Sequence, residues 1–385
     1  MQLPDYRGGS IVNLMSSIKK ALGGKSDYDP LRNFDISRLK NKNIVLLIID
    51  GLGYEFLKKY GKGTIFEKNL ERSMTSVFPS TTASATVTLT VGDAPQQHAL
   101  TGWFMYLKEI GMVATILPFL SRSGNFSLGK NNIKFKDIFK QESFFKRLKA
   151  KSFILRHKDY AFSDFNKATS RGAKIVPFKS IDELLKEINK IVTSEKGKKF
   201  VNAYWGELDS LSHRFGTDAK KTINHLKSLD KKIKSFLHSA KNSNTVVIIT
   251  SDHGQIDTKD KEKIIKLEKH PKLYECLTLP LCGEPRAAYC YVKPSKAKQF
   301  EKYVKSELGH ACLLYKSADL LKKNYFGLFS PNEKLKDRIG DYVIIMKDDY
   351  IIRDKLLGEK VDYYIGNHGG MSKEEMLVPL VVINC

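Results

Sequence analysis

The stretch NIVLLIID, residues 43–50, is an apolar run that ends in an acid and is followed by Gly-Leu-Gly. Short apolar runs that give way to a polar, glycine-rich loop are typical of parallel strands buried on both faces. KFVNAYW (199–205), followed by GELD, and NTVVIITSD (244–252), followed by HGQ, repeat the pattern. YVIIM (342–346) and PLVVI (379–383) are two further candidates. These runs predict a sheet whose buried strands come from distant parts of the chain.

Segments with helical periodicity, such as residues 180–192 and 218–240, lie between the expected strands. Alternating strands and helices indicate an α/β fold with a doubly wound, mostly parallel central sheet sandwiched by helices. Residues 255–364 have a different texture, with turn-rich segments and several short β-like runs. We therefore expect an inserted, smaller α+β cap there, on a catalytic core formed by residues 1–254 and 365–385.

Three acids, Asp50, Asp209 and Asp252, fall at or just past the carboxyl ends of expected strands. Ligands of doubly wound sheets bind beyond these strand ends. The pattern therefore predicts that three carboxylates from distant parts of the sequence meet at one edge of the sheet.

Three histidines accompany these acids. His213 lies four residues after Asp209, His253 directly follows Asp252, and His368 stands between glycines in GNHGG. Oxygen and imidazole donors without a thiolate suit Zn²⁺, with Mn²⁺ as the alternative. One catalytic metal must keep an open position, so six such ligands favour two divalent ions, an arrangement suited to phosphoryl transfer. Each motif alone has an ordinary explanation, and it is their joint occurrence that predicts a dinuclear site.

The stretch VFPSTTASAT, residues 77–86, places several hydroxyl side chains behind a proline. Pro79 and the short residues after it predict the start of a helix that directs a hydroxyl toward the metals. A threonine hydroxyl needs such activation to act as a nucleophile at neutral pH. The residues themselves leave the choice among the hydroxyls open.

The ordered set D…T…DxxxH…DH…H resembles the alkaline phosphatase superfamily, and specifically its type I phosphodiesterase and nucleotide pyrophosphatase family. The resemblance runs from about residue 43 to residue 380, and its most specific parts are VFPSTT, TSDHGQ and GNHGGMSKEEMLVPL. It implies that Thr82, the threonine of an FPxxT motif, is the nucleophile. It also implies two metal sites, one held by Asp209, His213 and His368, and the other by Asp50, Thr82, Asp252 and His253.

The resemblance further implies a two-metal phosphohydrolase that cleaves phosphodiester or pyrophosphate bonds through a phosphothreonine intermediate. A phosphomonoesterase and a phosphonate hydrolase of the same superfamily are the alternatives. Nucleotide-cleaving members continue with Phe-Pro-Asn after the threonine, whereas residues 83–85 here are Ala-Ser-Ala, which argues against a nucleotide substrate. Tyr204, where the family often keeps a tyrosine, and Arg286 in the inserted region are candidate substrate contacts.

The net charge is +23, from 65 Lys and Arg against 42 Asp and Glu. Lysine is spread along the chain instead of being clustered with aromatics, so we expect a small anionic phosphate ester as partner and no specific nucleic-acid binding. A basic polyanion-binding protein without catalysis is the alternative from another class. No apolar run reaches membrane-spanning length and no apolar leader is evident, so we expect no membrane span and a cytoplasmic protein. The five cysteines are expected to be reduced thiols, and oligomeric state is left open.

Overall fold

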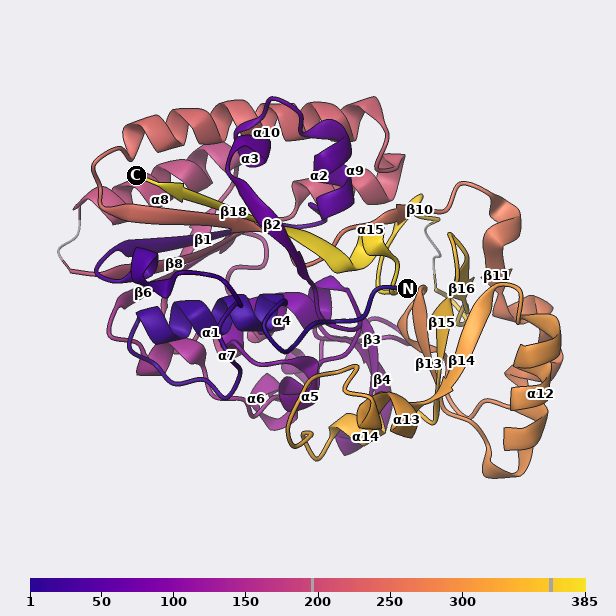
Figure 1. Ribbon diagram of the computed structural model, residues 1–385. Coiled ribbons are helices and arrows are strands. Elements are labelled where there is room, and N and C mark those ends of the chain that lie inside the picture. Colours follow the sequence, from indigo (N-terminus) through magenta and orange to yellow (C-terminus); the bar gives the residue numbers. More distant parts are fainter. Residues whose placement is uncertain (195–196, 360–362) are drawn as a thin grey trace.

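The structure is a computed structural model that describes residues 1–194, 197–359 and 363–385. Within these residues, seven strands form the central sheet in the order β2-β18-β9-β1-β8-β6-β7 (Figure 1). The strands from β9 to β7 are parallel, whereas β18 runs antiparallel to both of its neighbours. The mostly parallel sheet is therefore confirmed. Its strands are β1 (Asn43–Ile49), β2 (Leu70–Thr75), β6 (Lys151–His157), β7 (Lys174–Phe178), β8 (Lys199–Trp205), β9 (Thr245–Thr250) and β18 (Leu377–Asn384).

Strand β1 lies inside the sheet, and every one of its residues is buried. Its alternate side chains enter two separate hydrophobic cores, because successive side chains of a strand point to opposite faces. Helices cover both faces (Figure 1), which explains an apolar run without polar alternation. On one face lie α1 (Ile11–Ala21) and α4 (Thr82–Val91), and on the other lie α8 (Ile181–Ser194) and α10 (Lys220–Ser239).

A second, antiparallel sheet stands beside the first, in the order β14-β15-β13-β12-β3-β4-β5. Helix α12 (Ala297–Glu307) packs against it through Phe300 and Val304. Its strands are β3 (Phe104–Leu107), β4 (Met112–Thr115), β5 (Leu120–Ser121), β12 (Cys282–Glu284), β13 (Ala287–Cys290), β14 (Cys312–Lys316) and β15 (Tyr342–Met346).

The second sheet joins two segments that are far apart in sequence. Strand β12 pairs with β3 where Gly283 faces Phe104. The backbones come so close that a Cβ on Gly102 would lie 2.7 Å from the Gly283 Cα. The sheet thus takes strands from residues 104–121, which the sequence places in the core, as well as from residues 282–346. That residues 255–364 form a cap of their own stays a prediction.

Two of the expected strands differ from the expectation in the sheet they join or in their direction. The run YVIIM is β15 and belongs to the second sheet, and PLVVI lies in β18, which is antiparallel to its neighbours. An apolar run reports that a strand is buried, but it carries no information on which sheet the strand joins or in which direction. Strands β6 and β7 were not expected, because their apolar runs in KSFILRH and KIVPF are short and neither is closed by an acid and glycine.

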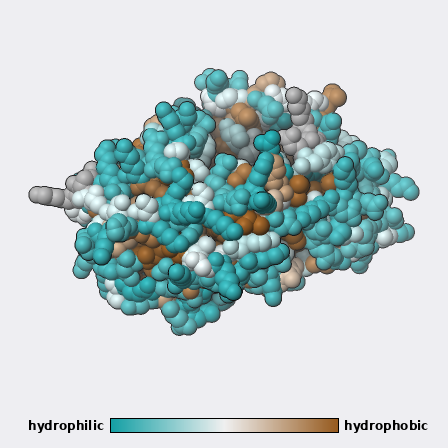
Figure 2. Space-filling view, turned by 90° about the horizontal axis from the view of Figure 1, so that it is seen from above, coloured by the Kyte–Doolittle hydropathy of each residue, from teal (hydrophilic) through white to brown (hydrophobic). Residues whose placement is uncertain are grey.

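The surface is mostly hydrophilic on the face shown in Figure 2, and the hydrophobic residues there form several separate patches. None of the helices in the described part of the chain is long and apolar enough to cross a membrane.

A buried ion pair connects the second sheet with the core. Arg286, just after β12, donates to both carboxylate oxygens of Glu375, over 2.9 Å and 3.1 Å, and to the Tyr350 carbonyl over 2.6 Å. Glu375 lies in α15 (Lys373–Met376), immediately before β18, and also accepts the Gly370 N–H. Burial alone would raise the pKa of Glu375, but the Arg286 guanidinium lowers it below its usual value. The pair therefore stays charged and fixes the second sheet against the end of β18.

Replacing Glu375 with alanine is expected to lower the free energy of unfolding by about 3–5 kcal/mol, because it leaves the Arg286 charge buried without a carboxylate. Denaturant unfolding measures the change. Glu374→Ala is the matched control, since Glu374 is exposed and should change stability by no more than about 0.5 kcal/mol. Equal effects of the two substitutions would contradict the role given to the pair.

Candidate metal centre and substrate pocket

The three acids lie together at the carboxyl edge of the central sheet. Asp50 directly follows β1, Asp252 follows β9, and Asp209 lies on α9 (Glu207–Phe215), which follows β8. These three strands are adjacent and parallel, so their carboxyl ends meet at one place. The loop after β9 packs so closely on α15 that a Cβ on Gly254 would lie 2.0 Å from the Glu374 carbonyl oxygen. Glycine is therefore needed directly after the Asp252–His253 pair.

His253 is the centre of the first group of candidate ligands. Its Nε2 lies 3.0 Å from the Thr82 Oγ1, 3.3 Å from the Asp50 Oδ1 and 3.6 Å from the Asp252 Oδ2. The ring is fully buried, and its Nδ1 lies 3.1 Å from the Gly254 carbonyl oxygen. Ligand atoms of Asp50, Asp252 and His253 all fall within 4.8 Å of one another, which is close enough for one metal ion.

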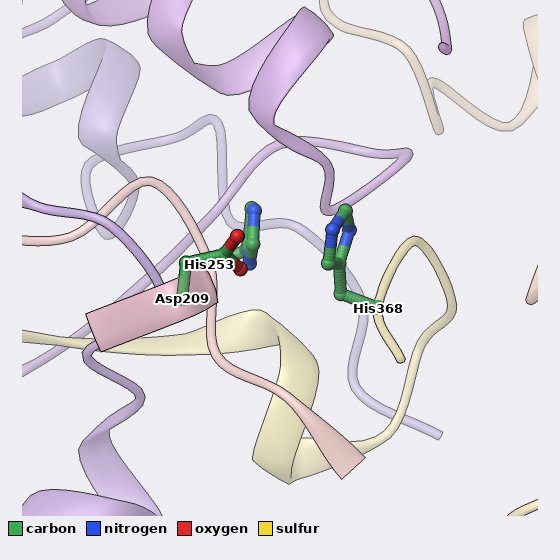
Figure 3. A group of neighbouring side chains, drawn as sticks. All are labelled: Asp209, His253 and His368. Carbon is green, nitrogen blue, oxygen red and sulfur yellow. The ribbon is translucent and has the colours of Figure 1, made fainter. Parts of the chain in front are cut away.

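A second group is formed by Asp209, His253 and His368, whose ligand atoms meet the same distance limit. Figure 3 shows the His253 and His368 rings face to face, with centroids 3.8 Å apart, and the Asp209 carboxylate beside His253. The His213 Nε2 lies 3.3 Å from the Asp209 Oδ2, and its Nδ1 lies 2.7 Å from the Gly366 carbonyl oxygen. All six expected Asp and His residues are thus neighbours. The grouping differs from the expected one, since His253 stands beside Asp209 and His368 where the resemblance implies His213.

The polar atoms of this cluster fit a bound cation. Within the described residues, the Asp50 Oδ1, the Asp252 Oδ2 and the His368 Nδ1 are buried without a hydrogen-bond partner. Such atoms are rare in native structures unless a ligand or ion satisfies them. Burial raises the pKa of Asp50, and the nearby Asp209 and Asp252 carboxylates raise it further. Burial also lowers the pKa of His368, as do its two histidine neighbours. The neutral His368 imidazole among crowded carboxylates forms a suitable site for divalent metal.

The two threonines at the start of α4 point in different directions. Thr81 is the N-cap residue, and its hydroxyl donates to the Glu284 Oε1 over 2.6 Å. Thr82 is the first residue of the helix, and its Oγ1 faces His253 and the cavity. Of these two hydroxyls, only that of Thr82 therefore lies beside the candidate ligands.

Glu284 is a buried residue of the site that the sequence did not reveal. Its Oε1 also accepts the Trp103 backbone N–H over 2.7 Å, so it ties the start of α4 to the segment that enters the second sheet. Burial raises the pKa of Glu284 to about 7, although the hydrogen bonds from Thr81 and Trp103 oppose the rise. No local motif marks it, because its position depends on the pairing of β12 with β3.

A cavity of about 1040 Å³ opens over the cluster and reaches between the two sheets. Tyr204 lines it and donates its hydroxyl hydrogen bond to the Asp50 Oδ2, and its contact with the substrate stays a prediction. Arg286 does not line it, because its guanidinium is directed at Glu375 and at backbone carbonyls, and this is a correction to its expected role. The cavity is rich in aromatic side chains, among them Trp103, Phe104, Tyr160, Phe178, Tyr204 and Trp205.

Residues 44–371 match the family model described as type I phosphodiesterase / nucleotide pyrophosphatase, and the chain belongs to this family. It is a hydrolase that acts on phosphoester bonds, and the family is metal-dependent. No curated protein matches the chain.

Solved structures with the same fold share little sequence with the chain. Murine ectonucleotide pyrophosphatase/phosphodiesterase 5, an inactive threonine-to-alanine variant in complex with AMP, has a TM-score of 0.66 at 19% identity, covering 88% of this chain and 87% of that one. The human counterpart has a TM-score of 0.67 at 18% identity, covering 89% and 87%. Phosphonoacetate hydrolase from Sinorhizobium meliloti 1021, in complex with phosphonoformate, has a TM-score of 0.64 at 13% identity, covering 89% of each chain.

Replacing Thr81 with valine is expected to lower the free energy of unfolding by about 1–3 kcal/mol, because the buried Glu284 loses a hydrogen-bond donor. Urea unfolding measures the loss. Thr82→Val serves as the control, since the half-buried Thr82 hydroxyl makes no contact with Glu284 and its removal should change stability by less than about 0.5 kcal/mol. A larger loss for Thr82→Val than for Thr81→Val would show that the two hydroxyls have been assigned to the wrong partners.

Proposed function

We propose that the protein is a two-metal phosphodiesterase or pyrophosphatase whose nucleophile is the Thr82 hydroxyl. The observation that carries the proposal is the meeting of the Thr82 Oγ1 with His253, 3.0 Å apart, beside the Asp50 and Asp252 carboxylates. A hydroxyl at the first position of a helix, among buried acids and imidazoles, is placed to attack a phosphorus atom bound there. The inactive threonine-to-alanine variant of the murine neighbour supports a threonine in this role.

The proposed metal ligands are the three aspartates and three histidines of the cluster, together with Thr82. We assign Asp209, His213 and His368 to one ion, because the His213 Nε2 lies 3.3 Å from the Asp209 Oδ2 and the His213 and His368 rings are 5.1 Å apart. We assign Asp50, Thr82, Asp252 and His253 to the other, although His253 also lies beside Asp209 and His368, because its Nε2 lies 3.0 Å from Thr82, 3.3 Å from Asp50 and 3.6 Å from Asp252. Zn²⁺ is the preferred ion and Mn²⁺ the alternative, because the donors are oxygen and imidazole only. When bound, such ions lower the pKa of the nucleophilic hydroxyl and neutralise charge on the phosphoryl oxygens.

The protein's own groups then position the reaction. The free N–H groups at the start of α4, together with the helix dipole, favour an anionic phosphoryl group next to Thr82. The Thr82 hydroxyl gives up its proton and its oxygen attacks in line, so that an oxygen–phosphorus bond forms. The bond to the leaving oxygen breaks, and the leaving group carries away the equivalent of that proton. Water then cleaves the phosphothreonine, which releases the phosphoryl product and restores the hydroxyl with one proton from the water.

The size of the cavity favours a diester or pyrophosphate over a simple phosphate monoester. A volume of about 1040 Å³ lined by aromatic side chains leaves room for an organic group beyond the reacting phosphorus. The AMP complex of the murine neighbour supports this class. Phosphonate hydrolysis is the second candidate, and the similar fold of phosphonoacetate hydrolase favours it.

Replacing Thr82 with alanine is expected to lower kcat for bis(4-nitrophenyl) phosphate at least about 1000-fold, because the nucleophilic oxygen is removed. Release of 4-nitrophenolate measures the rate, and thermal unfolding confirms that the variant is folded. Thr82→Ser keeps the oxygen and should retain most of the activity. Undiminished turnover by Thr82→Ala would exclude Thr82 as the nucleophile.

Removing divalent metal with a chelator is expected to abolish turnover, and Zn²⁺ or Mn²⁺ should restore it. Elemental analysis of the reloaded protein should find about two equivalents of metal. Asp209→Ala removes a ligand of one proposed ion and should reduce the content to about one equivalent. The control is Asp218→Ala, an exposed acid paired with Lys259, which should leave two equivalents bound. Less than one equivalent in the unmodified, reloaded protein would refute the two-metal proposal.

A further inference from the structure

Arg156 is a buried cation in the wall of the cavity. It lies near the carboxyl end of β6, its residue is 5% exposed, and it lines the same cavity as Thr82 and Asp50. Its Nη1 donates to the Leu155 and Asn202 carbonyls, over 3.0 Å and 3.2 Å, and its Nη2 donates to the Asn202 Oδ1 over 2.9 Å. A longer contact of 3.4 Å joins Nη2 to the Thr90 Oγ1. Every one of these partners is neutral.

The absence of a carboxylate partner sets Arg156 apart from the other buried arginines of the described chain. Arg122 pairs with Asp354 over 2.5 Å and with Glu359 over 3.2 Å. Arg286 pairs with Glu375, and Arg338 pairs with Glu109, each over 2.9 Å. Among the described residues no acid forms an ion pair with Arg156. Burial lowers its pKa to about 10, so the group is still charged at neutral pH. A buried charge without a counterion is costly, which indicates that an anion completes this site when the substrate binds.

Two tyrosine rings and one acid lie near Arg156 in the cavity wall. The Tyr204 ring centroid lies 5.7 Å from the guanidinium carbon, and the ring of the exposed Tyr160 lies 6.5 Å from that of Tyr204. The nearby acid of the cavity wall, Asp159, is exposed and pairs with His157 at 3.3 Å. Among the described residues it forms no ion pair with Arg156, so the guanidinium charge is not balanced by this acid.

The distance of Arg156 from Thr82 indicates how far apart two anionic groups of one substrate would lie if one bound at each residue. Thr82, Thr86 and Thr90 all line the cavity and follow one another at four-residue spacing along one face of α4. At 1.5 Å per residue, Thr90 lies about 12 Å along the helix from Thr82. Arg156 reaches Thr90, whereas the reacting phosphorus must lie at Thr82. This separation is too long for the carboxylate of phosphonoacetate and suits a larger substrate.

We propose that Arg156 binds a second phosphate group of the substrate, so that the natural substrate is a phosphodiester or pyrophosphate with a further phosphate several bonds away from the reacting phosphorus. A guanidinium suits this task because a charge-assisted hydrogen bond to a phosphate oxygen is stronger than the 3.4 Å contact with the Thr90 Oγ1 that it would replace. This inference rests on the proposed function, since it takes the metal cluster as the place of the first phosphate.

The test is a binding comparison with a matched pair of ligands, n-hexyl phosphate and hexane-1,6-diol bisphosphate. Titration calorimetry of the metal-loaded protein should find the bisphosphate bound at least about tenfold more tightly. In Arg156→Met the two affinities should become equal within about twofold. Lys179→Gln is the control, because Lys179 lines the same cavity but is exposed, and this variant should keep the preference.

Equal affinities for the two ligands in the unmodified protein would overturn the proposal, and this comparison decides even if Arg156→Met does not fold. A preference that survives in folded Arg156→Met, or that disappears in Lys179→Gln, would overturn it as well. The measurement needs no turnover. Failure of the proposed hydrolysis would therefore appear separately, in the assay with bis(4-nitrophenyl) phosphate.

Discussion

The crowding of three carboxylates at one edge of the central sheet is the constraint on which the rest of the site depends. Asp50, Asp209 and Asp252 are all buried, and like charges so close together are unfavourable without a cation. Burial alone would raise the pKa of Asp209, but His213 and then the other two histidines lower it below its usual value. The pKa of Asp50 is raised at the same time. The cluster therefore holds acids of unequal character, which metal binding would bring to a common, ionised state.

The second sheet supports this cluster from the other side. Glu284 in β12 holds the Thr81 hydroxyl, so that its neighbour Thr82 is left free to face His253. Two residues later, Arg286 fixes the same strand end to Glu375 beside the loop that carries His253. One short segment after residue 281 thus holds both the start of α4 and the loop that carries His253. A displacement of that segment would move the hydroxyl and the ligands relative to each other.

The sequence predicted the three adjacent parallel strands β1, β8 and β9 and the six Asp and His neighbours, because both follow from local signals. An apolar run closed by an acid and glycine reports a buried strand and its carboxyl end. It did not predict that residues 104–121 and 282–346 share one sheet, because strand pairing between distant segments leaves no local pattern. Arg286 and Glu284 show the same limit. The two residues are only two positions apart in the sequence. Their tertiary partners alone decide that the Glu284 side chain faces the site and the Arg286 side chain does not.

For Arg156, one feature could be predicted from the sequence and another depends on its tertiary partners. It lies near the carboxyl end of β6, where the rule for doubly wound sheets places ligand contacts. Recognising β6 in KSFILRH would have brought it to attention from sequence alone. What sequence could not supply is its lack of a carboxylate partner, since the buried Arg122, Arg286 and Arg338 look no different in the chain. Their charges are balanced by protein acids and therefore serve the fold. The charge of Arg156 is balanced only by what enters the cavity, and this makes it a determinant of the substrate.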